Sequence, residues 1–104
     1  MDKREAIAIA QNYVDTVSKK YNLAQAFIFG SYAKGNYRAD SDIDVAIVLM
    51  NAANLFDAQV DLLHLRTDED LQIEPHTFRD TDFDTDDPFV NEILQTGLKL
   101  KVAV

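Results

Sequence analysis

Two aspartates separated by one apolar residue are the side chains in this sequence whose spacing best suits metal chemistry. Asp42 and Asp44 flank Ile43 at the start of an apolar run. On a β-strand, residues i and i+2 share one face and lie about 6.5–7 Å apart along the chain. Two carboxylates at that spacing can hold the pair of metal ions, about 3.5–4 Å apart, that serves phosphoryl and nucleotidyl transfer. Taken alone, the pair is more typical of the solvated start of a strand.

A Gly-Ser dipeptide, ten residues before this pair, is suited to phosphate binding. Gly30 ends an apolar run, and because it has no Cβ it lets a ligand approach the backbone. A helical turn that begins at Ser31 would direct free N–H groups and the positive end of its dipole outward, which suits phosphate. Lys34 follows within one turn, where its ammonium group can reach a phosphate. By itself, however, Gly-Ser is also a common turn.

A third carboxylate, Glu74, lies among residues that favour a strand. It is flanked by Ile73 and Pro75 in a segment that alternates between apolar and polar residues. If this strand neighbours the one that begins at Asp42, Glu74 can complete a metal site or accept the proton of an attacking hydroxyl. The alternative is a Glu that faces solvent from a half-exposed strand. His76 would share its face, in a supporting, a catalytic or, as is more common for a lone His, a purely structural role.

The elements that must position these residues are alternating helices and strands. A helical period over residues 3–20 starts with a capping box of Asp2 and Glu5. The run 42–50 begins with alternation and becomes continuously apolar, which is typical of a central strand. We therefore expect one α/β (α+β) domain over residues 1–104, with a small mixed β-sheet flanked by helices. The remaining predicted elements are a strand over 24–29, a helical turn over 31–35, a helix over 52–66, a strand over 71–78, a helix from Pro88 to Gly97 and an edge strand over 98–104.

Apolar residues at helical spacing indicate the buried faces of the two main helices. The residues expected to be buried are Ile7, Ala10, Val14 and Val17 in the first helix and Leu55, Val60, Leu62, Leu63 and Leu65 in the second.

The acidic run 80–87 lacks the glycine and the final acidic ligand of a calcium-binding loop, so we expect a solvated loop there.

Charge and composition restrict the classes of partner. The sequence has 10 Lys and Arg against 18 Asp and Glu, a net charge of -8, which repels nucleic-acid backbones and makes broad nucleic-acid binding unexpected. It contains no Cys, which excludes disulfides and thiolate metal sites. No run approaches the roughly 18 apolar residues of a membrane helix, so we expect a cytoplasmic protein without membrane attachment.

The combined spacing resembles the GS-x10-DxD signature of the DNA polymerase β-like nucleotidyltransferases. The segments that carry the likeness to the minimal branch of that family (MNT) are Phe29–Gly35, Ser41–Val45, Ile73–His76 and Pro88–Gly97. The resemblance implies that Gly30 and Ser31, with Lys34 as a further candidate, bind the triphosphate of an NTP. It also implies that Asp42 and Asp44 bind two Mg²⁺ ions and that Glu74 is the third carboxylate.

Asp61 is a rival for the role of third carboxylate. Residues 60–62 (Val-Asp-Leu) resemble a strand motif of other family members, but Asp61 falls within a helical pattern. We prefer Glu74, which lies in a better strand. Because Glu is longer than Asp, its role as a base is better supported than tight metal ligation.

The minimal branch is similar to the antitoxin half of toxin–antitoxin systems whose toxin is a HEPN-domain RNase. The resemblance implies transfer of AMP from ATP to a tyrosine of that toxin. An acidic surface would suit a basic, RNA-handling partner. Two alternatives stay open: transfer to a small molecule such as an aminoglycoside, and an antitoxin that neutralises its partner by binding without turnover.

Overall fold

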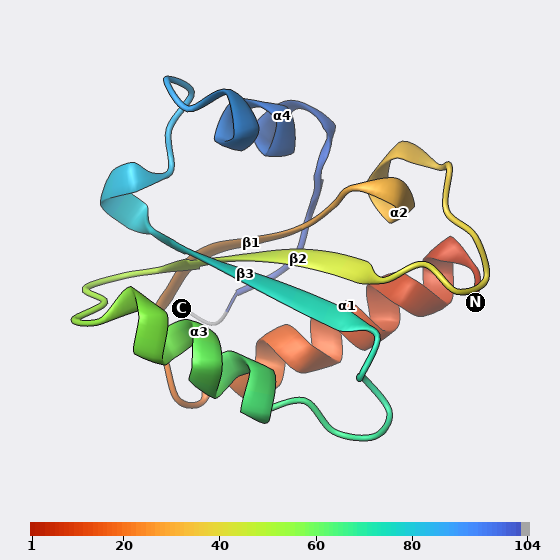
Figure 1. Ribbon diagram of the computed structural model, residues 1–104, viewed down its shortest axis with the longest axis horizontal. Coiled ribbons are helices and arrows are strands. Elements are labelled where there is room, and N and C mark those ends of the chain that lie inside the picture. Colours follow the sequence, from red (N-terminus) through yellow and green to blue (C-terminus); the bar gives the residue numbers. More distant parts are fainter. Residues whose placement is uncertain (103–104) are drawn as a thin grey trace.

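A four-stranded mixed sheet forms the middle layer of the protein, with helices on both faces (Figure 1). The computed structural model describes residues 1–102. Helix α4 covers one face, while α1 and α3 cover the other. The elements are α1 (Lys3–Ser18), β1 (Leu23–Phe29), α2 (Ser31–Lys34), β2 (Ile43–Leu49), α3 (Leu55–His64), β3 (Ile73–Arg79), the 3₁₀ helix η1 (Asp80–Asp82), α4 (Pro88–Thr96) and β4 (Leu98–Lys99). The predicted fold class is thereby confirmed.

The strand order is β3-β2-β1-β4, so β2 is central, as its continuous apolar run predicts. β1 is antiparallel to both β2 and β4, whereas β2 and β3 are parallel and α3 forms the crossover between them. The parallel register places Asp44 opposite Glu74, and the antiparallel register places Asp44 opposite Phe29. Paired residues on neighbouring strands point to the same face, so these three side chains share one face of the sheet.

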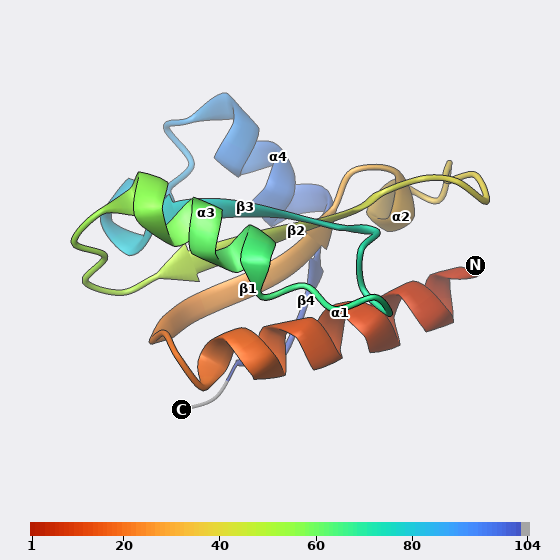
Figure 2. The ribbon, with the colours of Figure 1, turned by 60° about the horizontal axis from the view of Figure 1, so that its bottom comes forward.

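Two apolar cores lie on opposite faces of the sheet. Figure 2 shows α4 on one side of the sheet and α1 on the other. The larger core packs beneath α1 and α3, and the smaller one lies under α4. β1 and β2 contribute to both cores because successive strand residues point to opposite faces. The buried residues of the smaller core are Phe27, Phe29, Ala46, Val48, Phe83, Val90 and Ile93.

Side-chain caps define where the helices begin. Asp2 accepts a hydrogen bond from the backbone N–H of Glu5 at 2.8 Å, which confirms the predicted start of α1. Asn54 accepts one from the N–H of Asp57 at 3.0 Å, so α3 begins at Leu55, three residues later than predicted. Asp87 caps α4, which has a proline in its first turn, as expected. In residues 1–102 we find no helix with both the length and the apolar character to cross a bilayer.

The buried faces of the two main helices differ in part from those predicted. In α1 the predicted residues Ala10, Val14 and Val17 are buried. Ile7 was also expected in the core but is 36% exposed, and Ala6 and Tyr13 are buried instead. In α3 the buried residues are Leu62, which was predicted, and Ala58, which was not. The other positions predicted for this helix, Leu55, Val60, Leu63 and Leu65, are only partly buried.

The C-terminal part also departs from the prediction. The acidic segment forms a short helix, η1, rather than an irregular loop throughout, and Phe83 after it packs into the smaller core. The expected edge strand over 98–104 is present as β4, which pairs with β1 over Leu98–Lys99 only. Ala103 and Val104, which the prediction included, lie outside the described residues.

Candidate active site

Gly30 forms the turn between β1 and α2 and brings the backbone against Asp44. Its φ of 72° and ψ of -145° belong to a region that only glycine adopts readily. A Cβ built at this position would lie 2.6 Å from Oδ2 of Asp44. The absence of a side chain therefore lets the Gly30 turn and the Asp44 carboxylate occupy adjoining positions.

The short helix α2 is anchored by an aromatic pair. Tyr32 is fully buried and stacks on Tyr37 with ring centroids 4.4 Å apart. This contact ties α2 to the loop that leads into β2. It thereby restrains the turn of α2 that begins with Ser31, directly after Gly30.

The predicted metal-binding carboxylates lie on one face of neighbouring strands. Asp44 lies in β2 with 30% of its side chain exposed, and Asp42 directly precedes the strand and is exposed. Strand alternation, continued back by one residue, places Asp42 on the side of Asp44. Glu74 in β3 is directly opposite Asp44 and is also exposed. The three residues therefore come from the same end of the sheet.

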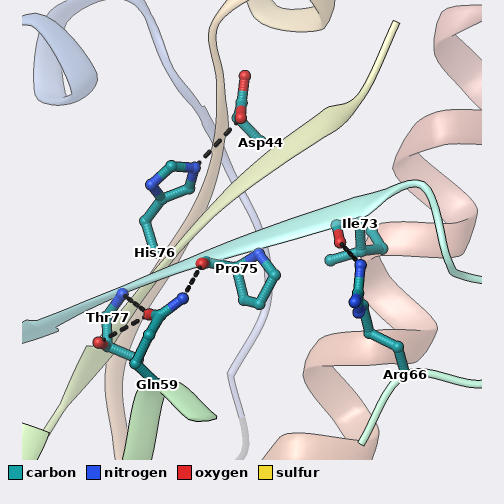
Figure 3. Close-up of polar contacts among 7 residues, drawn as sticks. All are labelled: Asp44, Gln59, Arg66, Ile73, Pro75, His76 and Thr77. Atoms are coloured by element: carbon teal, nitrogen blue, oxygen red, sulfur yellow. Dashed lines mark hydrogen bonds and ion pairs between the residues drawn. The ribbon is translucent and has the colours of Figure 1, made fainter. Parts of the chain in front are cut away.

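His76 lies beside Asp44, a contact that sequence reasoning did not identify. Its Nε2 is 3.2 Å from Oδ1 of Asp44, and Figure 3 shows the two side chains pointing toward each other from β3 and β2. The imidazole also packs edge-on against Phe29, with ring centroids 4.9 Å apart. The period of β3 places His76 on the face of Glu74, but the partner could be found only from the register of the two strands.

The outer edge of β3 is bound by a glutamine of α3 (Figure 3). Gln59 donates its amide N–H to the carbonyl of Pro75 at 2.7 Å. Its carbonyl oxygen accepts from the backbone N–H of Thr77 at 3.0 Å and from the Thr77 hydroxyl at 2.9 Å. The side-chain amide thus takes the place of a neighbouring strand, and it fixes the residues on both sides of His76.

Arg66, just after α3, supports the start of the same strand. Its guanidinium donates to the carbonyls of Leu71 and Ile73, each at 3.1 Å (Figure 3 draws the bond to Ile73). These bonds satisfy backbone acceptors at the exposed edge of the sheet. Together with Gln59, Arg66 holds β3 in the register that presents Glu74 and His76.

Lys34, predicted to bind phosphate, is engaged with α4. Its ammonium is 2.5 Å from Oε1 of Glu92, and the two side chains are 43% and 52% exposed. An exposed pair of this kind contributes little to stability, so the ammonium can leave Glu92 for a stronger anion. A cavity of about 150 Å³ lies next to this pair, between α4 and the turn at Gly30.

Asp61 lies on α3, away from the other carboxylates. Oδ2 of Asp61 accepts from the Tyr21 hydroxyl at 2.6 Å and forms an ion pair with Lys20 at 2.8 Å. The Lys20 ammonium and the Tyr21 hydroxyl hold the pKa of Asp61 below its ordinary value. The same hydrogen bond raises the pKa of Tyr21 to about 12. Asp61 thus has a structural partner on the face of the sheet opposite to Asp44.

The three carboxylates of the site are separate from one another but are ligands of the kind that Mg²⁺ prefers. As the side chains stand, no three His, Asp or Glu residues within 1–102 are close enough to hold one ion together. The chemistry nevertheless fits, because Asp42, Asp44 and Glu74 supply the hard oxygen ligands that Mg²⁺ prefers. In the part of the chain that the structure describes, neither Asp42 nor Glu74 has an ion-pair partner. A bound cation would offset this uncompensated charge.

Comparison with known proteins gives the same fold. The family model described as "Polymerase beta, Nucleotidyltransferase" matches residues 11–102. Among curated protein sequences, none matches the chain. A crystal structure of a candidate nucleotidyltransferase from Sulfolobus solfataricus is similar, with a TM-score of 0.69 and 20% identity over 93% of this chain and 80% of that one.

Two structures of toxin–antitoxin complexes are also similar. One contains AMP-PNP and has a TM-score of 0.53 with 16% identity, over 99% of this chain and 75% of that one. The other is an Asp-to-Glu double mutant of the complex MntA–HpeT, with a TM-score of 0.53 and 14% identity over the same shares of the two chains. At these identities the likeness concerns the fold.

Proposed function

Because the chain belongs to the polymerase beta nucleotidyltransferase family, we propose that it transfers AMP from ATP to a hydroxyl group of a protein in a Mg²⁺-dependent reaction. The observation that carries this proposal is the approach of the Gly30 turn to the Asp44 carboxylate, with Glu74 opposite on the next strand. A phosphate-binding turn and a set of carboxylates have to adjoin for nucleotidyl transfer, since the metal ions lie between phosphate and protein.

The residues have distinct roles in this proposal. Gly30 and Ser31 bind the triphosphate, and Lys34 leaves Glu92 to join them. Asp42, Asp44 and Glu74 hold two Mg²⁺ ions, which when bound neutralise phosphate charge and activate the acceptor oxygen.

Glu74 is also suited to act as the base. The acceptor oxygen forms a bond to the α-phosphorus, the bond from that phosphorus to the bridging oxygen breaks, and pyrophosphate leaves. The proton of the acceptor hydroxyl passes to a carboxylate oxygen of Glu74, whose exposed position allows an incoming acceptor to reach it. Asp61 is not part of the proposal, because Lys20 and Tyr21 engage it elsewhere.

A protein acceptor is supported by two kinds of observation. Proteins of similar fold are found in toxin–antitoxin complexes, one of them with the ATP analogue AMP-PNP. The net charge of -8 also suits a partner with a basic, RNA-handling surface. We therefore propose a tyrosine of a HEPN-domain RNase toxin as the acceptor and antitoxin activity as the biological role.

A label-transfer assay tests the proposal. The purified protein is incubated with Mg²⁺ and ATP labelled at the α-phosphate, in lysate from cells depleted of this protein, and compared with Asp44→Ala. We expect one labelled protein band that Asp44→Ala and EDTA both abolish, while circular dichroism shows that the variant is folded.

The other outcomes discriminate between the alternatives. Label on small molecules alone would support an aminoglycoside-type transferase. No label with a protein that binds ATP and still neutralises a toxin would support inhibition by binding. Label transfer that Asp44→Ala leaves intact would contradict the assignment of Asp44 as a metal ligand.

A further inference from the structure

We infer that His76 is a positioning residue for Asp44: its Nε2–H holds one carboxylate oxygen so that the other faces the Gly30 turn. The inference rests on the proposed function only in taking Asp44 as a metal ligand. It assigns to His76 a role that does not require contact with the nucleotide or the acceptor.

The two oxygens of Asp44 have different neighbours. Oδ1 is 3.2 Å from Nε2 of His76, while Oδ2 lies 2.6 Å from the point where a Cβ of Gly30 would stand. A carboxylate can only accept hydrogen bonds, so the ring nitrogen that faces it must carry the proton. This bond restrains rotation of the carboxylate and leaves Oδ2 directed at the predicted phosphate turn.

His76 is itself held from several sides. It pairs with Ala46 on β2, whose small side chain leaves room for the imidazole above the sheet. The ring packs on Phe29, which in turn packs edge-on against Phe89 of α4 at 5.5 Å. Gln59 fixes the backbone residues on both sides of His76 from the opposite side of β3. A residue that orients a metal ligand needs such support.

Direct coordination by His76 is the main alternative. Mg²⁺ prefers oxygen ligands, and Nε2 already faces the Asp44 carboxylate. A purely structural role is the second alternative, since the ring also packs against Phe29. Two substitutions of His76 can distinguish these cases: one removes the donor and keeps an aromatic ring, and the other keeps a donor and removes the ring.

The test compares His76→Phe and His76→Gln with the unmodified protein. Phe keeps an aromatic ring against Phe29 but has no donor, whereas the amide nitrogen of Gln lies as many bonds from the backbone as Nε2 of His. Mn²⁺ affinity is measured by electron paramagnetic resonance, with the α,β-methylene analogue of ATP present. We expect His76→Phe to bind Mn²⁺ about 10- to 100-fold more weakly, which is the usual effect of removing such a partner. His76→Gln should recover most of the affinity, and thermal unfolding shows that both variants are folded.

Three results would overturn the inference. If His76→Phe binds Mn²⁺ as tightly as the unmodified protein, the role of His76 is limited to packing. If both variants lose the same Mn²⁺ affinity, the hydrogen-bond donor is not the relevant property. A nitrogen coupling on bound Mn²⁺ that disappears in His76→Phe would make His76 a ligand. None of these measurements requires AMP transfer, so a protein that binds Mn²⁺ as expected but transfers nothing would contradict the proposed function alone.

Discussion

The Asp44 carboxylate can lie where it does only because residue 30 is a glycine. Gly30 is required both by its backbone angles and by the carboxylate that occupies the place of its missing side chain. Gly35, five residues later, also has a positive φ, of 86°, but a Cβ there would meet nothing within 4 Å. Substitutions of the two glycines can therefore be compared: both introduce backbone strain, but only a change at Gly30 also disturbs the Asp44 carboxylate.

Gly30→Ala should remove both metal binding and stability, whereas Gly35→Ala should reduce stability alone. We expect Gly30→Ala to lower the free energy of unfolding by about 1–3 kcal/mol, because alanine is strained at these angles. It should also displace Asp44 and abolish Mn²⁺ binding. Gly35→Ala should cost about 1–2 kcal/mol for its left-handed conformation and leave Mn²⁺ affinity unchanged. Urea unfolding and Mn²⁺ titration measure the two effects, and normal Mn²⁺ affinity in Gly30→Ala would contradict the proposed geometry.

At the scale of elements, the arrangement of β3 depends on α3. β3 is an edge strand with a proline at its third position, so Pro75 offers a carbonyl but no N–H to a neighbour. Gln59 of α3 satisfies that carbonyl and the Thr77 amide on the free edge. The crossover helix thus closes an edge that would otherwise be open to pairing with another strand.

Gln59→Ala should destabilise the protein and loosen β3. Loss of the Gln59 amide leaves the Pro75 carbonyl and the Thr77 N–H without their partner, which should lower the free energy of unfolding by about 1–3 kcal/mol. Hydrogen exchange at the Thr77 amide should accelerate at the same time. Phe56→Ala on the same helix, where the side chain is 73% exposed, is the control and should change stability by less than about 0.5 kcal/mol. Equal stability of Gln59→Ala and the unmodified protein would refute this role of α3.

For the molecule as a whole, the net charge of -8 governs how it meets other proteins. Much of that charge lies at one place, in η1 and the loop that follows it. Asp82 and Asp86 are exposed there, and within residues 1–102 their side chains accept no hydrogen bond. This region can therefore steer a basic partner without any change in the fold.

Neutralising these two residues should slow association with a basic toxin partner. In Asp82→Asn/Asp86→Asn the association rate, measured by stopped-flow, should fall several-fold at low salt. Asp68→Asn/Glu69→Gln changes the same amount of charge in the loop between α3 and β3 and should have a smaller effect. The difference should disappear at about 1 M NaCl, where the Debye length is only about 3 Å. Equal effects of the two double variants would show that only net charge matters.

The sequence by itself determined the elements and the pattern of the site. The continuous apolar run predicted β2 as a central strand, and the spacing of Gly30 and Asp42 indicated the family. The capping box predicted the start of α1, and Pro88 predicted the start of α4. These signals are local, because periodicity, caps and turn residues act within a few positions of the chain. The roles of the site residues stay predictions.

Tertiary structure decided which residues meet. The register of β3 against β2 places Glu74 opposite Asp44 and His76 at its carboxylate, and a slip of one residue would turn both to the other face. Likewise, only the packing of α3 pairs Asp61 with Lys20. Strand register and helix orientation depend on contacts between segments far apart in sequence, where the burial of whole faces outweighs local preference. For that reason the partner of Asp44 could be found only in the folded chain.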